Sequence, residues 1–208
     1  MSRFFLLLTM ALISAPAVLA QDADYTRYEF VGGYSFQRSS NNAATMDRNG
    51  TAVSNGATVL FDEKYQNYNG FYGEFNQNLN RHVGIVTSFT ATFDTSDYVD
   101  LKTGHVFPAS VKRYDLMIGP RYNWRLSGIT PFVHAMAGFT HIRASFGADL
   151  SPQKKTDTAF SMAFGGGMDI HAGEHIDVRA VQVDYMPTFF NSTHQNNIRL
   201  GAGVKIKP

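Results

Sequence analysis

Hydrophobic and polar side chains alternate along eight separate segments of this chain. In "NIRLGAGVKIKP", the last of the eight, Leu200 and Val204 share one set of alternate positions and Arg199 lies in the other. Successive side chains of a β-strand point to opposite faces, so the pattern predicts a strand with one apolar face and one charged face. The eight segments are 27–38, 69–79, 83–93, 110–122, 129–142, 158–170, 176–188 and 197–208.

The connections between these segments alternate in length. Three are short, at "NRH", "NWRLSG" and "HAGEH", whereas the other four are longer, polar and rich in Gly, Asn, Ser and Asp, the longest being 39–66. Antiparallel strands connected in this way place the short turns and both termini at one end and the long loops at the other, as outer-membrane barrels do. The sequence therefore predicts an all-β fold, an eight-stranded antiparallel up-and-down transmembrane β-barrel.

The two faces of the strands carry different side chains. Where the alternation is clear, the apolar face has no Asp, Glu or Arg, whereas the other face has charges of both signs among Gly, Ser and Thr. The interior of an eight-stranded barrel is just wide enough for side chains to fill it. A cation on the lipid side would cost about 2–4 kcal/mol at mid-bilayer. We therefore expect the apolar face to contact lipid and the charges to pair inside the barrel.

Three sets of residues follow from this assignment. The expected charge network of the lumen is Glu29, Glu74, Arg113, Asp115, Arg121, Asp184, Arg199 and Lys205. The expected lipid-facing residues include Phe30, Phe71, Phe75, Ile85, Phe89, Leu116, Ile118, Phe164, Val183, Leu200 and Val204. The expected aromatic girdle, at the membrane interfaces, is Tyr28, Phe36, Phe93, Tyr114, Tyr122, Phe160 and Tyr185. The alternation leaves open the facing of 129–142 and the side of Arg179.

The N-terminal segment has a composition unlike the rest of the chain. One basic residue, Arg3, precedes an apolar run that is too short to span a bilayer, and Val18-Leu19-Ala20 ends it with a small-x-small pattern. This predicts a signal peptide at 1–20 and an exported barrel domain at 21–208; a buried N-terminal helix is the alternative. The formal charge of +1 gives no indication of a nucleic-acid partner, and the absence of cysteine excludes disulfides.

The chain resembles the OmpA-like outer-membrane β-barrel family, in its free-standing form without a peptidoglycan-binding domain. The resemblance rests on "RYEFVGGYSF", "YDLMIGPRYNW", "ITPFVHAMAGF", "FSMAFGGGMDI" and "VQVDY", and extends over about 25–206. It implies a monomer in the bacterial outer membrane, whose partners are outer-membrane lipid, lipopolysaccharide and the barrel assembly machinery. Barrels of this kind usually end in an aromatic residue, and the sequence departs from that pattern with Ile206-Lys207-Pro208.

Two short motifs contain residue types that occur in reactive sites. "HAGEH" offers His171, Glu174 and His175, but a short turn supplies no fixed metal geometry, so a solvated turn is the better interpretation. "NSTH" places Ser192 near His194 in a polar connection, without an acid to orient the histidine. We expect no metal, no cofactor and no enzymatic activity.

These observations predict a non-catalytic outer-membrane barrel with a structural or surface-interaction role. Two alternatives remain open from the sequence. One is a narrow, charge-lined pore for small solutes or ions, because the lumen charges could form a constriction. The other is a soluble exported barrel whose apolar face lies inside and binds a small apolar ligand.

Overall fold

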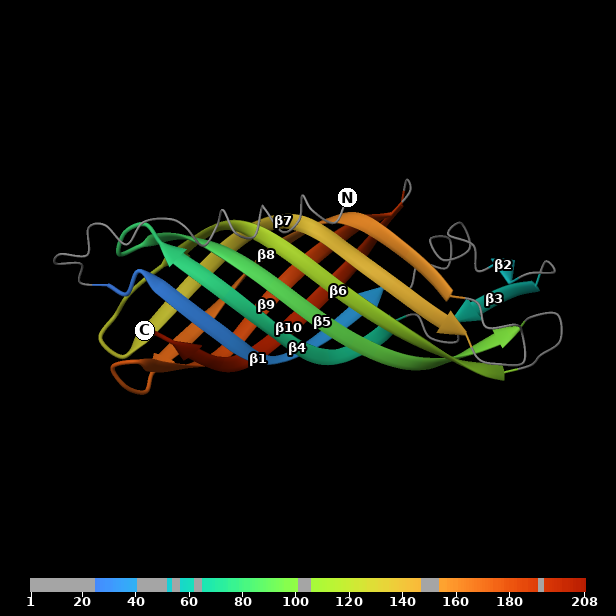
Figure 1. Ribbon diagram of the computed structural model, residues 1–208, viewed down its shortest axis with the longest axis horizontal. Helices are drawn as coiled ribbons and strands as arrows, with labels where there is room; N and C mark the ends of the chain where they lie inside the picture. The colour runs from blue at the N-terminus through green and yellow to red at the C-terminus, as the bar shows by residue number, and fades with distance from the viewer. Residues whose placement is uncertain are drawn as a thin grey trace, which may run out of the picture.

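The described part of the chain contains ten strands, and eight of them close into a barrel (Figure 1). The barrel strands are β1 Tyr28–Ser40, β4 Tyr65–Asn78, β5 Val83–Asp100, β6 Val106–Asn123, β7 Ile129–Phe146, β8 Lys154–His171, β9 Ile176–Phe190 and β10 Thr193–Ile206. In this computed structural model each of these strands pairs antiparallel with the next, and β10 pairs with β1. The predicted closed eight-stranded antiparallel barrel is confirmed.

The structure describes most of the chain after the N-terminal segment. The described residues are 25–40, 52–53, 57–61, 65–100, 106–146, 154–190 and 193–208, with side chains for 25–40, 65–95, 110–145, 156–189 and 194–208. The predicted signal peptide lies outside these residues. No helix long and apolar enough to cross a membrane occurs in the part of the chain that the structure describes.

The two ends of the barrel differ in their connections. The turns 79–82, 124–128 and 172–175 lie at one end together with the C-terminus, and we call this the turn end (Figure 1, left). The first turn is held by Asn80, whose Oδ1 accepts hydrogen bonds from the backbone N–H groups of His82 and Val83 at 2.8 Å. The opposite end, where the other four connections leave the barrel, is the loop end.

The strands run further toward the loop end than the sequence pattern predicts. β5 continues to Asp100 and β6 begins at Val106, so most of the predicted polar connection between them is a paired ladder. Apolar and polar side chains alternate only where one face of a strand meets an apolar environment. Backbone hydrogen bonds between strands can continue where the side chains do not alternate. The expectation of long connections is therefore wrong for this segment.

The predicted loop 39–66 also contains regular structure. Two short strands, β2 Ala52–Val53 and β3 Ala57–Phe61, pair with each other, and β3 pairs with the end of β5. The barrel wall thus extends beyond its closed ring on one side, at the right end of Figure 1.

Side chains of the barrel strands alternate between the interior and the outer wall. On β6, Arg113, Asp115 and Met117 are buried, whereas Leu116 and Ile118 are 47% and 50% exposed. The sequence left open which face of 129–142 points inward. On β7 the even-numbered positions from 130 to 140 point inward and the odd-numbered positions point outward. The apolar face lies outside and the polar face inside, which is opposite to the arrangement of a soluble barrel with an apolar interior.

A bulge interrupts the alternation on β9. The pairing with β10 shifts between Gly201 and Gly203, and Ala180 and Val181 both lie on the outer side. The extra residue reverses the parity of the strand before it, as a β-bulge does. Arg179 consequently points into the barrel, where it is fully buried.

Candidate functional site

Among the residues whose side chains the structure describes, five cationic and six anionic ones are buried inside the barrel, none of them more than 4% exposed. They are Arg113, Arg121, Arg179, Arg199 and Lys205, and Glu29, Glu74, Asp115, Asp169, Asp177 and Asp184. A buried charge without a partner is costly, whereas a pair with further hydrogen bonds can be accommodated. The near-equal numbers allow the interior charges to neutralise one another.

Arg179 of β9 links carboxylates from two other strands. Its Nη1 donates to Glu74 Oε2 on β4, and its Nε donates to Asp169 Oδ1 on β8 at 2.8 Å. Asp169 Oδ2 also lies 3.1 Å from both Arg121 Nη2 and Lys205 Nζ. This central cluster therefore joins five strands, β4, β6, β8, β9 and β10, across the lumen.

A second pair lies beside the central cluster. Arg199 Nε donates to Asp184 Oδ2 at 2.8 Å, and His134 Nε2 lies 2.7 Å from Asp184 Oδ1. The amide nitrogen of Gln182 donates to both Glu74 and Asp184, at 2.8 and 3.0 Å. Gln182 thereby connects the two groups of ion pairs into one network.

The turn end of the lumen is closed by lysine and arginine side chains. Lys205 Nζ lies 2.7 Å from Asp177 Oδ2 and 3.8 Å from Glu29 Oε2. Lys207 Nζ lies 2.7 Å from Asp177 Oδ1, and Arg125 Nη2 lies 3.0 Å from Glu29 Oε1. These contacts extend the network to the turn end of the barrel.

A separate cluster occupies the lumen nearer the loop end. Arg113 Nε donates to Asp115 Oδ1 at 3.0 Å, and its two terminal nitrogens donate to Asn197 Oδ1 at 3.3 Å and Thr188 Oγ1 at 3.1 Å. Thr140 Oγ1 donates to Asp115 as well. The hydroxyl and amide partners satisfy the donors of a guanidinium that has one carboxylate beside it.

Phe132 is an aromatic side chain inside the charged lumen. Its side chain is 2% exposed, and two guanidinium groups lie over the ring, with Arg121 Cζ 3.7 Å and Arg179 Cζ 4.4 Å from the ring centroid. Such cation–π contacts are stronger when both partners are desolvated. The ring fits because position 167 is glycine, where a Cβ atom would lie 2.8 Å from Phe132 Cζ.

An apolar cluster lies between the two groups of polar contacts on one side of the lumen, formed by β5 to β9. On β9, Met186 is the inward residue between Asp184 and Thr188, so it lies between the two groups of polar contacts. We call its contiguous cluster the methionine layer: Val86, Met117, Met136, Ala163 and Met186, each no more than 2% exposed. On the other side of the lumen, Asn197 and Arg199 are successive inward residues of β10, and Arg199 Nη1 donates to Ser88 Oγ at 3.4 Å. The methionine layer therefore fills only part of the cross-section of the lumen.

The structure places all eight sequence-predicted lumen charges inside the barrel. Arg113 and Asp115 form their own cluster, and the other six join the larger network. Sequence reasoning left Asp169, Asp177 and Arg179 out of that network. The bulge reverses the facing of Asp177 and Arg179, so the alternation of the later part of β9 does not predict their side. Asp169 alternates with the small residues of 158–170, and this pattern places it on the same face as the other lumen charges.

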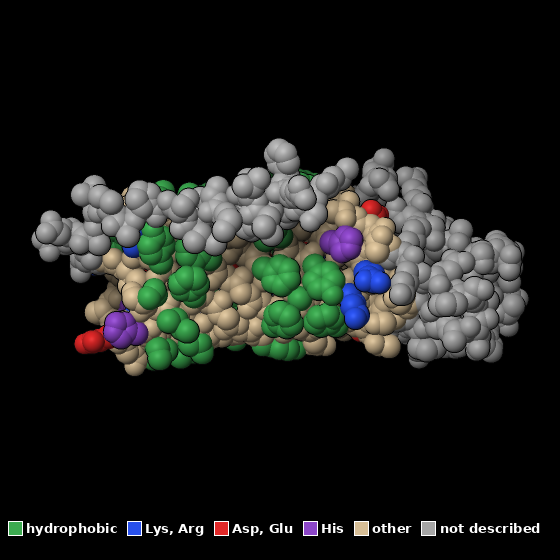
Figure 2. Space-filling model, viewed as in Figure 1, with side chains coloured by type: hydrophobic (Ala, Val, Ile, Leu, Met, Phe, Trp, Pro, Cys, Tyr) green, Lys and Arg blue, Asp and Glu red, His purple; other side chains and the backbone are tan. Residues whose placement is uncertain are grey.

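The outer wall carries the residues expected to face lipid and the expected aromatic girdle. The members of both sets occupy outward positions, exposed or half-buried. Phe93 lies between Phe71 and Tyr114, with both centroid distances 6.3 Å, toward the loop end. Tyr28 stacks on Phe75 at 5.9 Å toward the turn end. Figure 2 shows the hydrophobic side chains gathered in groups on this wall.

The other motifs make local contacts. His171 Nδ1 lies 2.9 Å from Asp177 Oδ1, and His175 Nδ1 lies 3.0 Å from the backbone oxygen of Lys207. No group of three or more His, Cys, Asp or Glu that could hold a metal occurs among the described side chains. Ser192, of the other motif, lies outside the described residues.

Comparisons with known proteins give one family and several similar structures. The model of the family described as outer membrane protein beta-barrel domain matches residues 5–205. The crystal structure of Ail, the attachment invasion locus protein of Yersinia pestis, is 18% identical with a TM-score of 0.51, covering 85% of this chain and 97% of Ail. A second Ail structure, in complex with the heparin analogue sucrose octasulfate, is 17% identical with a TM-score of 0.51, covering 86% and 99%. A search of curated protein sequences gave no match.

Proposed function

We propose, because the chain belongs to the outer membrane protein β-barrel domain family, that it is a barrel with a closed interior and a structural or surface-interaction role without catalysis. The bacterial outer membrane is the location of this family, and lipid is the environment of its outer wall. The sequence-predicted signal peptide at 1–20 would direct the chain there, and the barrel assembly machinery would insert it.

The observation that carries the proposal is the filled lumen. Ion pairs and hydrogen bonds connect the central cluster to the turn end, and the methionine layer fills the side of the lumen formed by β5 to β9 between that network and the Arg113 cluster. A narrow pore would need one of these layers to open, which would leave buried charges without partners. A plugged barrel that holds the loop end outside the cell is the function that this geometry supports.

The same burial argues against catalysis in the interior. His134 and Asp184 form the pairing that a general base often uses, but they are 5% and 0% exposed. No substrate can reach this pair without displacing the network around it. The closed ladder also leaves no unpaired edge in the barrel ring, which agrees with the expected monomer.

Solute flux into proteoliposomes tests the proposal. Vesicles containing the refolded protein, with insertion verified by heat-modifiable migration on a gel, should admit sugars and ions no faster than protein-free vesicles. Vesicles with a general porin provide the positive control. Flux that rises with the amount of inserted protein would favour the pore alternative instead.

A further inference from the structure

The outer wall has an uneven distribution of charge. Among the outward strand positions whose side chains the structure describes, the charged residues are Arg38, Lys112 and Arg143, all of them exposed. None of the outward positions in this set carries Asp or Glu. All three cations lie toward the loop end, and the described part of the chain gives none of them a carboxylate partner.

Each of these cations lies nearer to the loop end of the barrel than the aromatic residues of the outer wall on its own strand do. Arg38 is the next outward residue after Phe36 on β1, and Lys112 pairs with Phe93 of β5. Lys112 also pairs with Arg143 of β7. Figure 2 shows basic side chains and a histidine directly beside a hydrophobic group on one face. Cations in this position meet the headgroups of the lipid leaflet whose acyl chains contact the aromatic residues.

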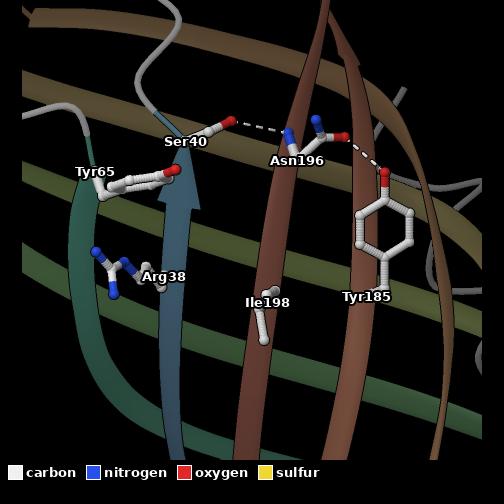
Figure 3. A pocket seen from close by; sticks show the side chains of 6 residues that line it. All are labelled: Arg38, Ser40, Tyr65, Tyr185, Asn196 and Ile198. Carbon is white, nitrogen blue, oxygen red and sulfur yellow. Dashed lines mark hydrogen bonds between the residues drawn. The ribbon is translucent and has the colours of Figure 1, made fainter.

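Arg38 lines a groove in the outer wall (Figure 3). The groove has a volume of about 430 Å³ and lies between β1, β4, β9 and β10. The Arg38 guanidinium lies over the Tyr65 ring, 4.4 Å from its centroid. A guanidinium held against a ring keeps its hydrogen-bonding edge available for an oxyanion.

The other walls of the groove have a polar side and an apolar side. The Asn196 backbone N–H donates to Ser40 Oγ at 3.1 Å, and the Tyr185 hydroxyl donates to Asn196 Oδ1 at 2.6 Å (Figure 3). Ile198, which is 52% exposed, continues the wall toward the middle of the barrel. A ligand with an anionic group near Arg38 and an acyl chain along Ile198 and the Tyr185 ring complements this surface.

We propose that this groove binds a phosphorylated lipid of the outer leaflet, with a phosphate on Arg38 and an acyl chain against Ile198 and Tyr185. The Lys112–Arg143 pair, on the other side of the barrel ring, offers a second phosphate contact of the same kind. This proposal concerns the outer wall and is independent of whether the lumen is closed. Lipid binding and solute flux are measured separately, so either the lipid site or the closed lumen can be disproved without the other.

Lipid titration by native mass spectrometry tests the site in the refolded full-length chain in detergent micelles. The probe is diphosphorylated lipid A, compared with the same lipid after removal of both phosphates. Arg38→Gln should weaken binding of the phosphorylated lipid about fivefold, as expected for one cation at an anionic lipid surface. The matched control is Arg81→Gln, which removes an exposed arginine in the turn 79–82 at the opposite end. It should bind like the unmodified protein, and Arg38→Lys should recover part of the loss.

Three results would overturn the proposal. They are equal affinity for the two lipids, an unchanged affinity in Arg38→Gln, and an equal loss in Arg81→Gln. Inorganic pyrophosphate provides the soluble arm of the experiment. If pyrophosphate alone binds as tightly as lipid A and Arg38→Gln weakens it equally, the ligand is a free phosphate compound and the assignment to lipid is wrong.

Discussion

At the scale of single residues, the lumen is organised by side chains that serve several partners at once. Arg179 contacts Glu74 and Asp169 and also lies over Phe132. A buried charge without a partner is strongly destabilising, so removing such a residue is expected to lower the stability of the barrel more than the net contribution of the intact ion pairs. Glycine residues contribute in a different way, because the absence of a side chain on one strand leaves space for a large side chain from another strand.

Replacing Arg179 with glutamine should lower the free energy of unfolding by about 3–5 kcal/mol, because Glu74 and Asp169 each lose a buried partner. The measurement is denaturant unfolding in lipid vesicles, followed by the fluorescence of the single tryptophan, Trp124. Arg81→Gln is the matched control, because it removes an exposed arginine in the turn 79–82, outside the barrel interior. Equal stability of both variants would show that the interior pairs are dispensable.

Gly201 should not tolerate valine. A Cβ atom at Gly201 would lie 3.1 Å from Cε1 of the buried Tyr72 ring, so the branched side chain must displace that ring at a cost of about 1–3 kcal/mol. At Gly32, which points outward, a Cβ atom meets nothing within 4 Å, so Gly32→Val is the control and should leave stability unchanged or raised. The same unfolding assay compares them, and a loss in Gly32→Val equal to that in Gly201→Val contradicts the packing assignment.

At the scale of the strands, the sequence predicts the number, order and facing of the elements because alternation records which side meets an apolar environment. It does not predict where β5 and β6 stop, since their loop-end portions pair through the backbone without an apolar face. It also fails at the bulge of β9, where one extra residue reverses the side of Arg179. The individual ion pairs lay beyond prediction because they depend on the stagger between strands, which alternation does not specify.

Arginine at Leu116 should impair insertion of the barrel. Leu116 is 47% exposed on the outer wall of β6, between the buried Asp115 and Met117, and its paired neighbour on β7 is Phe139. A cation near the bilayer midplane costs about 2–4 kcal/mol, so Leu116→Arg should reduce the folded yield in lipid vesicles. Leu116→Ala removes the same side chain without adding charge and should fold. A Leu116→Arg protein that is fully folded and soluble without detergent would contradict the outward assignment.

At the scale of the whole molecule, the structure combines a wall suited to lipid with an interior that neutralises its own charges. The eight-stranded ring is the smallest barrel type in its class, so its lumen is filled by side chains rather than by water. The molecule then has two surfaces left for interactions, the outer wall and the loop end. The proposed lipid groove uses the first, and a surface role uses the second.

The measurement that tests the closed lumen most directly is the conductance of the refolded chain in a planar bilayer, recorded over a range of salt concentration and pH. With insertion verified by heat-modifiable migration, we expect a silent bilayer, because paired charges and packed side chains fill the lumen. Discrete and reproducible current steps, with an ion selectivity that changes in Arg113→Glu or Glu74→Arg, would contradict it and show that the lumen charges line a pore.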